Sequence, residues 1–269
     1  MPVLNQKEVR AIGLELREAE RSRRQIPLVS ARREGLTMED AYAIQHAFVA
    51  AKKKDGARQK GWKIGLTSRA MQSALGIDIP DSGVLVDDMF FDSGDTISPD
   101  RFIEPRIEAE IAFVMADDLE GPGVTIHDVL RATEFVTPAL EILDTRIVRR
   151  EQKSGRTRTV IDTIADNAAN AGIVLGTRAL RPGEVDLRWI GAIVSRNGTV
   201  EETGLGAGVL DNPLRGIAWL ANRLAAHGDS IKAGEVLLSG SFIRPIEAPH
   251  SSTITADYGP FGTVSCHFA

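Results

Sequence analysis

The fold is decided around the stretch Ala51-Lys-Lys-Lys-Asp-Gly-Ala-Arg-Gln-Lys-Gly-Trp-Lys-Ile-Gly65, where a helical pattern gives way to short strands. On its N-terminal side, the run of three lysines lies where basic residues are favoured, in the last turn of a helix. On its C-terminal side, Trp62-Lys-Ile64 is a short apolar segment bounded by glycines, which is typical of a strand. The sequence therefore changes from helix to strand at about residue 60.

Two helices are expected upstream of this change. The first runs from about Gln6 to Gln25 and carries apolar residues at helical spacing. The second follows Thr37, because Thr37 and Asp40, three residues later, form a capping box in front of an apolar pattern. It ends at the lysine run. We expect the two helices to pack as a hairpin that forms an N-terminal helical lobe over residues 1–60.

Short strands dominate downstream, where apolar segments are broken by Gly, Pro and Asp. Asn197-Gly198 between two of these segments predicts a hairpin turn. The only long helix expected in this half begins at Pro213, a residue favoured in the first helical turn, and ends at Gly228. The expected strands are Val84–Val86, Arg106–Met115, Ala139–Leu143, Gly172–Leu175, Trp189–Arg196, Val200–Glu202, Val236–Gly240, Ser252–Asp257 and Thr263–Phe268.

The order of these elements predicts the fold class. Helices come first and many strands follow without regular helical crossovers, which argues against a doubly wound or (β/α)₈ sheet. We predict an α+β fold, with a curved and mostly antiparallel β-core over residues 61–269 behind the N-terminal helical lobe.

Composition bounds the kind of protein and its partners. With 269 residues, 43% of them hydrophobic and 26% charged, the chain is long enough to bury a full core. The net charge of -5 offers no basic face for a phosphate backbone, so nucleic acid is not an expected partner. The single cysteine, Cys266, excludes an internal disulfide and favours a reducing, cytoplasmic setting. Apolar runs are too short for a signal peptide or a membrane span, so no membrane association is expected.

Three carboxylates fall in two predicted strands. Glu108 and Glu110 alternate with apolar residues in Arg106–Met115 and therefore share one face of their strand. Glu141 lies in an apolar strand, where burial of its carboxylate is costly unless a cation or donor pairs with it. Carboxylates on adjacent strands suit Mg²⁺ or Mn²⁺. Spacing alone nevertheless favours an ordinary strand with one solvated face over a metal site.

Two more residues are candidates for chemistry. Lys63 lies in a short apolar strand, from which its ammonium group can reach a carboxylate or polarise a carbonyl. The alternative is a partly exposed lysine whose charge reaches the water at a strand edge. Asp81, before Ser82-Gly83, is by default a turn residue, and Asp166-Asn167 is by default part of a loop.

Other chemistries lack support in the sequence. None of the five histidines lies in an H-E-x-x-H or H-x-H arrangement, so a histidine zinc site has no signature. Cys266 and His267 are neighbours on a predicted strand and point to opposite faces, so they cannot pair as nucleophile and base. Gly204-Leu-Gly-Ala-Gly208 lacks the spacing and the βαβ context of a dinucleotide-binding loop.

Several segments together resemble the hydratase/decarboxylase branch of the fumarylacetoacetate hydrolase superfamily. The likeness extends over nearly the whole chain, and it is specific as a set although no single motif is. It implies a β-core of the fumarylacetoacetase C-terminal type and homo-oligomers built from dimers, often decamers. The segments are Gly61-Trp-Lys-Ile-Gly-Leu-Thr-Ser-Arg-Ala-Met-Gln72, Pro80-Asp-Ser-Gly-Val-Leu85, Pro105-Arg-Ile-Glu-Ala-Glu-Ile-Ala-Phe-Val114, Pro138-Ala-Leu-Glu-Ile142, Ala165-Asp-Asn-Ala-Ala-Asn-Ala-Gly172 and Gly240-Ser-Phe242.

The resemblance also implies a set of site residues. The family's Mg²⁺ ligands fall on Glu108, Glu110 and Glu141, with Mn²⁺ as an alternative ion. The family's active-site lysine falls on Lys63. Asp81 matches an acidic position near the bound 2-oxo acid, and we expect it to move the proton.

The activity that the resemblance implies is hydration of a 2-hydroxy-2,4-dienoate or its 2-oxo tautomer, with a seven-carbon dioate from aromatic catabolism as the expected substrate. Arg69 or Arg244 is a candidate for holding the distal carboxylate, and Asp166 and Asn167 are candidates for positioning the substrate. Two alternatives stay open. One is a decarboxylase acting on a 2-oxo-hexenedioate, and the other is a non-catalytic scaffold for a pathway enzyme.

Overall fold

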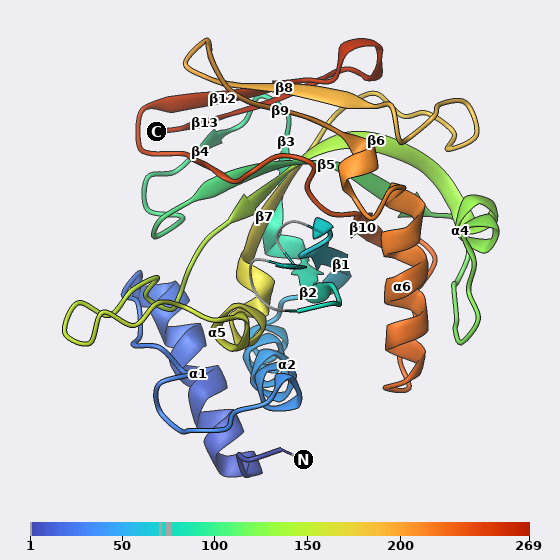
Figure 1. Ribbon diagram of the computed structural model, residues 1–269. Coiled ribbons are helices and arrows are strands. Elements are labelled where there is room, and N and C mark those ends of the chain that lie inside the picture. Colours follow the sequence, from blue (N-terminus) through green and yellow to red (C-terminus); the bar gives the residue numbers. More distant parts are fainter. Residues whose placement is uncertain (1, 70–71, 74–76) are drawn as a thin grey trace.

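The computed structural model describes residues 2–69, 72–73 and 77–269 (Figure 1). Two helices, α1 (Gln6–Ser22) and α2 (Met38–Lys54), pack against each other as predicted. Thr37 caps α2, and its capping box with Asp40 is present. α1 ends at Ser22 rather than near Gln25, because the next residue adopts a left-handed conformation that ends the helix.

The strands form two sheets. The first has the order β2 (Asp81–Val86), β1 (Gln59–Gly65), β10 (Val236–Leu238), β5 (Arg106–Met115), β6 (Thr133–Leu143), β7 (Asn170–Leu175) and β3 (Phe90–Asp92), with β11 (Ile246–Glu247) paired to β5. The second has the order β4 (Thr96–Ile97), β13 (Thr263–Phe268), β12 (Ser252–Asp257), β8 (Gly191–Arg196) and β9 (Thr199–Leu205).

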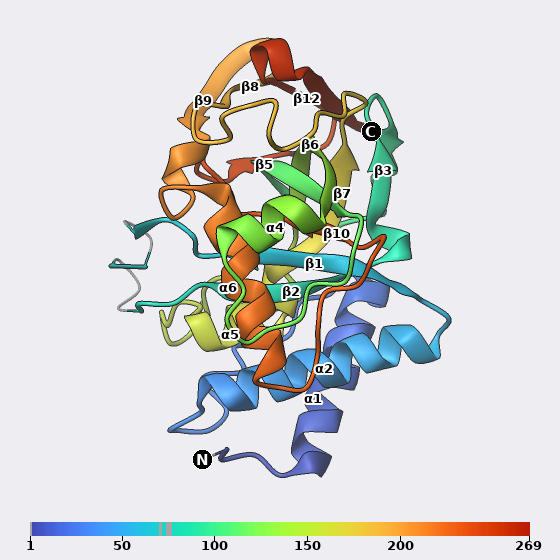
Figure 2. The ribbon, with the colours of Figure 1, turned by 90° about the vertical axis from the view of Figure 1, so that its right-hand side faces the viewer.

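The α+β prediction is confirmed. Most strand pairs among the described residues run antiparallel, and the parallel pairs are β1 with β10, β3 with β7 and β13 with β4. The second sheet, the first sheet and the N-terminal helices lie one below the other (Figure 2). At Asn197 and Gly198 the predicted hairpin turn joins β8 to β9, with both residues at positive φ.

Further helices lie on the sides of the sheets. α6 (Pro213–Ala225) contacts α4 (Ile126–Ala132) at one side of the first sheet, and α5 (Val160–Ala165) lies between that sheet and α2 (Figure 1). Four 3₁₀ turns, η1 (Asp87–Met89), η2 (Asn167–Ala169), η3 (Gly206–Gly208) and η4 (Gly259–Phe261), connect the elements. No helix of the described residues has the length and apolar character that a membrane span requires.

Several elements differ from the prediction. β6 begins at Thr133, six residues before the expected start, and the short elements β3, β4, β11, α4 and α5 were not expected. β10 ends at Leu238, and the following Gly240 has φ +116°. Elements of two or three residues carry too little periodicity to be recognised from sequence.

Two clusters of buried apolar residues support these layers. The larger fills the space around the two sheets. The smaller joins α1 and α2, through Leu16, Ile44 and Phe48, to Ile147 and Ile164 of the later chain. The helices are therefore packed on residues from both sides of position 60, and the division into units 1–60 and 61–269 stays a prediction.

Candidate metal centre and active site

The three predicted carboxylates meet on the first sheet. In the register of β5 and β6, Glu108 lies directly opposite Glu141, and Glu110 lies two residues further along the same face of β5. One carboxylate oxygen from each residue lies within 4.8 Å of the others. The alternation predicted that Glu108 and Glu110 share a face, and the pairing of the two strands brings Glu141 to them.

Donors from the chain hold two of these carboxylates. The backbone N–H of Gly240 donates to Glu110 Oε2 at 2.7 Å, and the Asn170 side-chain amide donates to Glu141 Oε1 at 2.8 Å. Glu110 Oε1 and Glu141 Oε2 are buried and have no hydrogen-bond partner among the described residues. A buried oxygen without a partner is costly. Carboxylate oxygens in this state fit a divalent cation such as Mg²⁺ or Mn²⁺.

The proximity of the carboxylates changes their acidity. Burial, and then the charge of Glu141, raises the pKa of Glu108 to about 8. The same causes, with Glu108 added, raise the pKa of Glu110 well above its usual value. Without a cation, the cluster therefore retains protons at neutral pH.

Lys63 lies inside the site. It is 3% exposed, its Nζ lies 3.2 Å from Glu141 Oε1, and it donates to the carbonyl oxygen of Ala168 at 3.0 Å. The alternative of a partly exposed lysine at a strand edge is therefore wrong. Burial alone would lower the pKa of Lys63, but the surrounding carboxylates, Glu141 foremost, outweigh it and raise that pKa.

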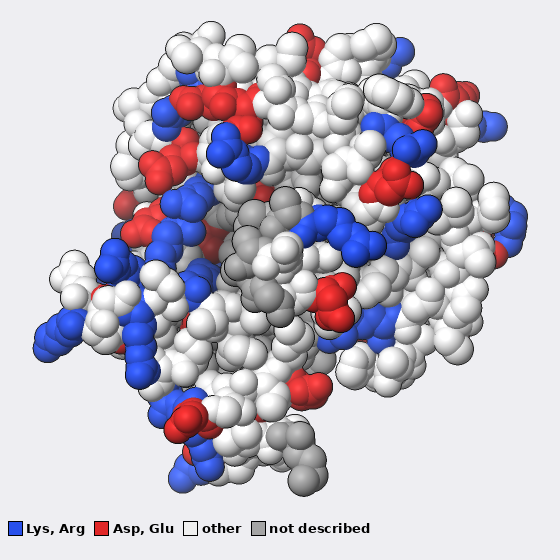
Figure 3. Space-filling view, viewed as in Figure 1, with Lys and Arg blue, Asp and Glu red and all other residues white. Residues whose placement is uncertain are grey.

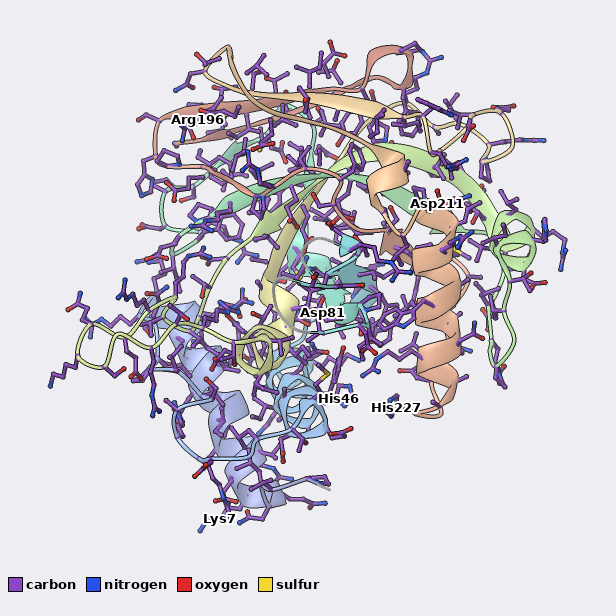
Figure 4. All side chains as sticks on the ribbon, viewed as in Figure 1. Lys7, His46, Asp81, Arg196, Asp211 and His227 are labelled. Carbon is purple, nitrogen blue, oxygen red and sulfur yellow. The ribbon has the colours of Figure 1, made fainter. Side chains whose placement is uncertain are left out.

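Asp81 is the first residue of β2 and is buried, so its default interpretation as a turn residue is wrong. It lies opposite Gly65 of β1, in the part of the first sheet above α2 (Figure 4). A Cβ added at Gly65 would come within 2.3 Å of Asp81 Oδ1 and 3.0 Å of Lys63 Nζ, so both groups lie against this glycine. Burial raises the pKa of Asp81, although the charge of Lys63 opposes the shift.

The prediction that Asp166 contacts the substrate needs correction. Asp166 is fully buried, and its carboxylate binds Arg146 Nε at 2.5 Å and Arg158 Nη2 at 3.1 Å. Its own backbone carbonyl also accepts a bond from Arg146. A buried carboxylate with two arginine partners has no free oxygen to offer a ligand.

Asn167 is likewise engaged by the chain rather than directed to a ligand. Its side-chain amide accepts from the N–H of Val84 at 2.8 Å and donates to the carbonyl of Val84 at 2.9 Å. It ties β2 to the turn that follows α5. The expected contact with the substrate is therefore replaced by a contact that holds the strand of Asp81.

The two candidate arginines line two adjoining cavities, one of which includes Glu108. A cavity of about 310 Å³ is lined by Glu108, Gly65, Thr67 and Arg244. The Arg244 side chain is 83% exposed and pairs with Glu202 at 2.6 Å. Arg69 is exposed and lines an adjoining cavity of about 550 Å³, which shares Ser68 and Gly208 with the first.

Basic side chains gather around this second cavity. Arg188 and Arg215 both pair with Asp211, at 2.8 Å and 3.6 Å, at the start of α6. Figure 3 shows blue and red side chains mixed over this part of the surface, and Figure 4 labels Asp211 there. The linings of the two cavities hold three arginines, Arg69, Arg215 and Arg244, beside three acidic residues, Glu108, Glu202 and Asp211. The arginines offer an anionic ligand charged donors.

Three residues that support the cluster were not predicted. Asn170 and Gly240 hold carboxylates, and Tyr258 donates to the carbonyl of Ala139 at 2.5 Å and accepts from the N–H of Glu110 at 3.2 Å. Asn170 and Gly240 lie in segments that carry the family resemblance, but their residue types alone do not indicate this role. Tyr258 has no signal in the sequence.

The chain is similar to known enzymes over nearly its whole length. It is 51% identical over 257 residues to 2-oxo-hept-4-ene-1,7-dioate hydratase of Escherichia coli, covering 96% of each chain. The solved structure of 4-oxalocrotonate decarboxylase from Pseudomonas putida G7, complexed with magnesium and adipate, superposes with a TM-score of 0.94 at 33% identity and covers 100% of both chains.

A more distant structure shares the fold. Fumarylacetoacetate hydrolase from Exiguobacterium antarcticum superposes with a TM-score of 0.58 at 12% identity, covering 79% of this chain and 75% of the hydrolase. No protein-family model matches the chain.

Proposed function

Because this chain belongs to the hydratase/decarboxylase branch of the fumarylacetoacetate hydrolase superfamily, we propose that it hydrates 2-oxohept-4-ene-1,7-dioate to 4-hydroxy-2-oxoheptane-1,7-dioate. The observation that carries the proposal is the cluster of half-buried Glu108 with buried Glu110 and Glu141 against Lys63, in a chain 51% identical to a hydratase of this dioate. The reaction is a step of aromatic catabolism.

Glu108, Glu110 and Glu141 are the proposed ligands of one divalent cation, with Mg²⁺ as the physiological ion and Mn²⁺ as a substitute. The partnerless oxygens of Glu110 and Glu141 support this assignment. When bound, the ion supplies Lewis-acid polarisation of the 2-oxo acid. Gly240 and Asn170 keep two of the ligands oriented.

Lys63 acts as a fixed positive charge. The double bond of the substrate joins C4 and C5 and is not conjugated with the 2-oxo group, so a proton first moves from C3 to C5 and the double bond shifts to C3 and C4. The oxygen of water then bonds to C4, and the electrons of the C3–C4 double bond move towards the 2-oxygen. Because the carboxylates raise the pKa of Lys63, its ammonium group stays protonated and offsets this negative charge. It does so from a buried position, where charge interactions are stronger than in water.

Asp81 is the proposed proton carrier. As a carboxylate it takes a proton from the attacking water, and as the acid it gives a proton to the carbon next to the carbonyl. Its raised pKa brings the two forms closer in free energy near neutral pH than for a solvated aspartate. Water is thereby divided between two carbons, and Asp81 returns to its starting state.

Several assignments concern the rest of the molecule. Arg69 or Arg244 holds the distal carboxylate of the dioate, since each lines one of the two adjoining cavities. Asp166 and Asn167 do not contact the substrate. They hold the segments that carry the site, Asp166 through its two arginine partners and Asn167 through Val84 of β2. Dimers assemble into larger homo-oligomers such as decamers, and the enzyme works in the cytoplasm.

Product analysis tests the proposal. The purified chain is incubated with Mg²⁺ and the seven-carbon dienoate, and the expected product is the 4-hydroxy-2-oxo acid without release of CO₂. Release of CO₂ from a 2-oxo-hexenedioate, in preference to hydration, would instead identify a decarboxylase like the solved relative. Absence of any turnover, with metal present, would leave a non-catalytic scaffold.

A further inference from the structure

A buried glutamine of the N-terminal helices joins two chain segments on either side of the site. Gln45 of α2 is 1% exposed, and its side-chain nitrogen donates to the carbonyls of Ser82 and Ile164, both at 2.9 Å. Ser82 follows Asp81 on β2, and Ile164 lies in α5. Since a glutamine amide has two N–H groups, both of its donors are used to tie β2 to α5.

The segment after α5 holds the partners of Lys63 and Glu141. Within η2, Ala168 offers the carbonyl that accepts from Lys63, and Asn170 follows with the amide that binds Glu141. Three consecutive residues of η2, Asn167, Ala168 and Ala169, have φ values of 54°, 52° and 59°. Such left-handed conformations are costly for residues other than glycine and persist only where the surroundings hold them.

β2 is held from the same helix at a second point. Tyr42, one turn before Gln45 on α2, accepts a hydrogen bond from the N–H of Ser82 at 3.2 Å. Residue 82 therefore has both of its backbone polar groups bonded to side chains of α2. Helix α2 therefore helps to fix the distance between Asp81 and the η2 segment. Asn167 of η2 fixes the same distance directly, through its two hydrogen bonds to Val84 of β2.

We infer that Gln45 is a positioning residue of the site: it sets the separation between Asp81 on β2 and the η2 groups that orient Lys63 and Glu141. It acts through Ser82 and Ile164 and touches no reacting group. The inference rests on the proposed function for its catalytic consequence. Its structural consequence, an altered orientation of Glu141, is independent of the substrate.

The main test is Gln45→Met, which keeps the side-chain length and removes both N–H donors. A misplacement of reacting groups by about 1 Å costs on the order of a hundredfold in rate. We expect kcat to fall about tenfold to a hundredfold, with KM changed by less than about threefold, because the loss lies in alignment rather than in binding.

A matched control separates positioning from stability. Asn222 of α6 also makes two bonds to the backbone, since its amide accepts from the N–H of Val124 and donates to the carbonyl of Val124, both at 2.9 Å. It joins α6 to the loop before α4. Asn222→Leu is expected to lower the melting temperature about as much as Gln45→Met while leaving kcat unchanged.

A second readout uses no substrate. The affinity for Mn²⁺, measured from the electron paramagnetic resonance of the free ion, is expected to fall at least about threefold in Gln45→Met and to stay unchanged in Asn222→Leu. Should Gln45→Met not fold, Tyr42→Phe removes one hydroxyl and keeps the ring against Arg223, whose guanidinium carbon lies 4.2 Å from its centroid. The same direction of change is expected for this variant.

The outcomes separate the inference from the proposed function. If Gln45→Met and Tyr42→Phe keep the kcat and Mn²⁺ affinity of the wild type, Gln45 is structural only and the inference is overturned. If the wild type shows no hydratase turnover but Gln45→Met still weakens Mn²⁺ binding, the proposed function fails and the positioning role stands.

Discussion

Three carboxyl groups gathered against one lysine make the charge of the site depend on both protons and metal. Glu108 has a pKa of about 8 and Glu110 one well above its usual value, so the metal-free cluster retains protons that a cation must displace. Lys63 neutralises only part of the remaining charge. Proton uptake and cation binding therefore compete for the same oxygens.

We predict that Mg²⁺ binding at about pH 7 releases protons. Calorimetric titration in two buffers of different ionisation enthalpy measures the number released, which is expected to fall as the pH rises through about 8, the pKa of Glu108. Glu110→Gln removes one ligand and is expected to weaken Mg²⁺ binding without unfolding the protein. Binding enthalpies that do not depend on the buffer would contradict the raised pKa values.

The metal-free protein is expected to lose stability as the pH rises. The folded-state pKa values of Glu108 and Glu110 exceed their unfolded values, so the folded state binds more protons than the unfolded chain. This stability is fully present below the usual glutamate pKa and is lost as the pH rises through about 8. Urea midpoints of chelated protein should be lower at about pH 9 than at about pH 6, and saturating Mg²⁺ should reduce the difference.

Lys63→Ala is expected to lower stability as well as turnover. Both Lys63 and its partner Glu141 are buried, and removing one member of a buried ion pair typically costs about 3–5 kcal/mol. Added Mg²⁺ should restore part of this loss, because a cation also compensates Glu141. Urea unfolding with and without Mg²⁺ measures the free energy of unfolding of both proteins. A metal-free variant as stable as the metal-free wild type would show that the ion pair of Lys63 and Glu141 does not stabilise the fold.

At the scale of elements, several helices carry their start signal in the sequence. Thr37 with Asp40, Thr125 with Asp128 and Thr159 with Asp162 all form the same capping box. Only the first precedes a long apolar pattern, so α2 was predicted and the six- and seven-residue α5 and α4 were not. A cap without periodicity does not distinguish a short helix from a loop.

The alternation of Glu108 and Glu110 on a strand predicted their shared face, because side-chain direction in a strand follows from sequence position alone. The register that brings Glu141 opposite Glu108 depends on pairing between strands and is not fixed by local sequence. For the same reason Asn170 and Tyr258 were missed. Asp166 and Asn167 were expected at the substrate because nothing local reveals Arg146 or Val84 as their partners.

The bend after β10 gives a further prediction. Gly240 has φ +116°, and a Cβ there would lie 2.3 Å from Thr67 Oγ1, while its N–H holds Glu110. Gly240→Ala is expected to destabilise the protein by more than about 2 kcal/mol and to weaken Mg²⁺ binding. Gly234→Ala is the control, since Gly234 has φ +80° with nothing within 4 Å of an added Cβ, and its cost should stay near about 1 kcal/mol. Equal losses in the two variants would show that the contact with Thr67 is unimportant.

At the scale of the molecule, the arginines that line the two adjoining cavities make the substrate's second charge matter. The seven-carbon dioate is expected to exceed 2-hydroxypenta-2,4-dienoate about ten- to a hundredfold in kcat/KM, the effect of one charged hydrogen-bonded contact. Arg69→Gln and Arg244→Gln distinguish the two candidates. Replacing the arginine that holds the distal carboxylate should lower kcat/KM for the dioate and leave kcat/KM for the shorter substrate unchanged. Because Arg244 already pairs with Glu202 while Arg69 lines the adjoining cavity, the larger effect is expected for Arg69. Equal kcat/KM for both substrates would reject the dioate.

The insertion of β10 between β1 and β5 has a consequence for how the molecule acquires its structure. Residues 236–238 complete the middle of a sheet whose neighbouring strands begin at residues 59 and 106. When only the first 230 residues have been synthesised, β1 and β5 lack the strand that pairs between them. The amide of Gly240 that orients Glu110 is also not yet made. Pairings this distant in the chain carry a large loop-closure cost and form slowly. Cation binding thus belongs to the last stage of folding, and a nascent chain acquires it only after most of its length has left the ribosome.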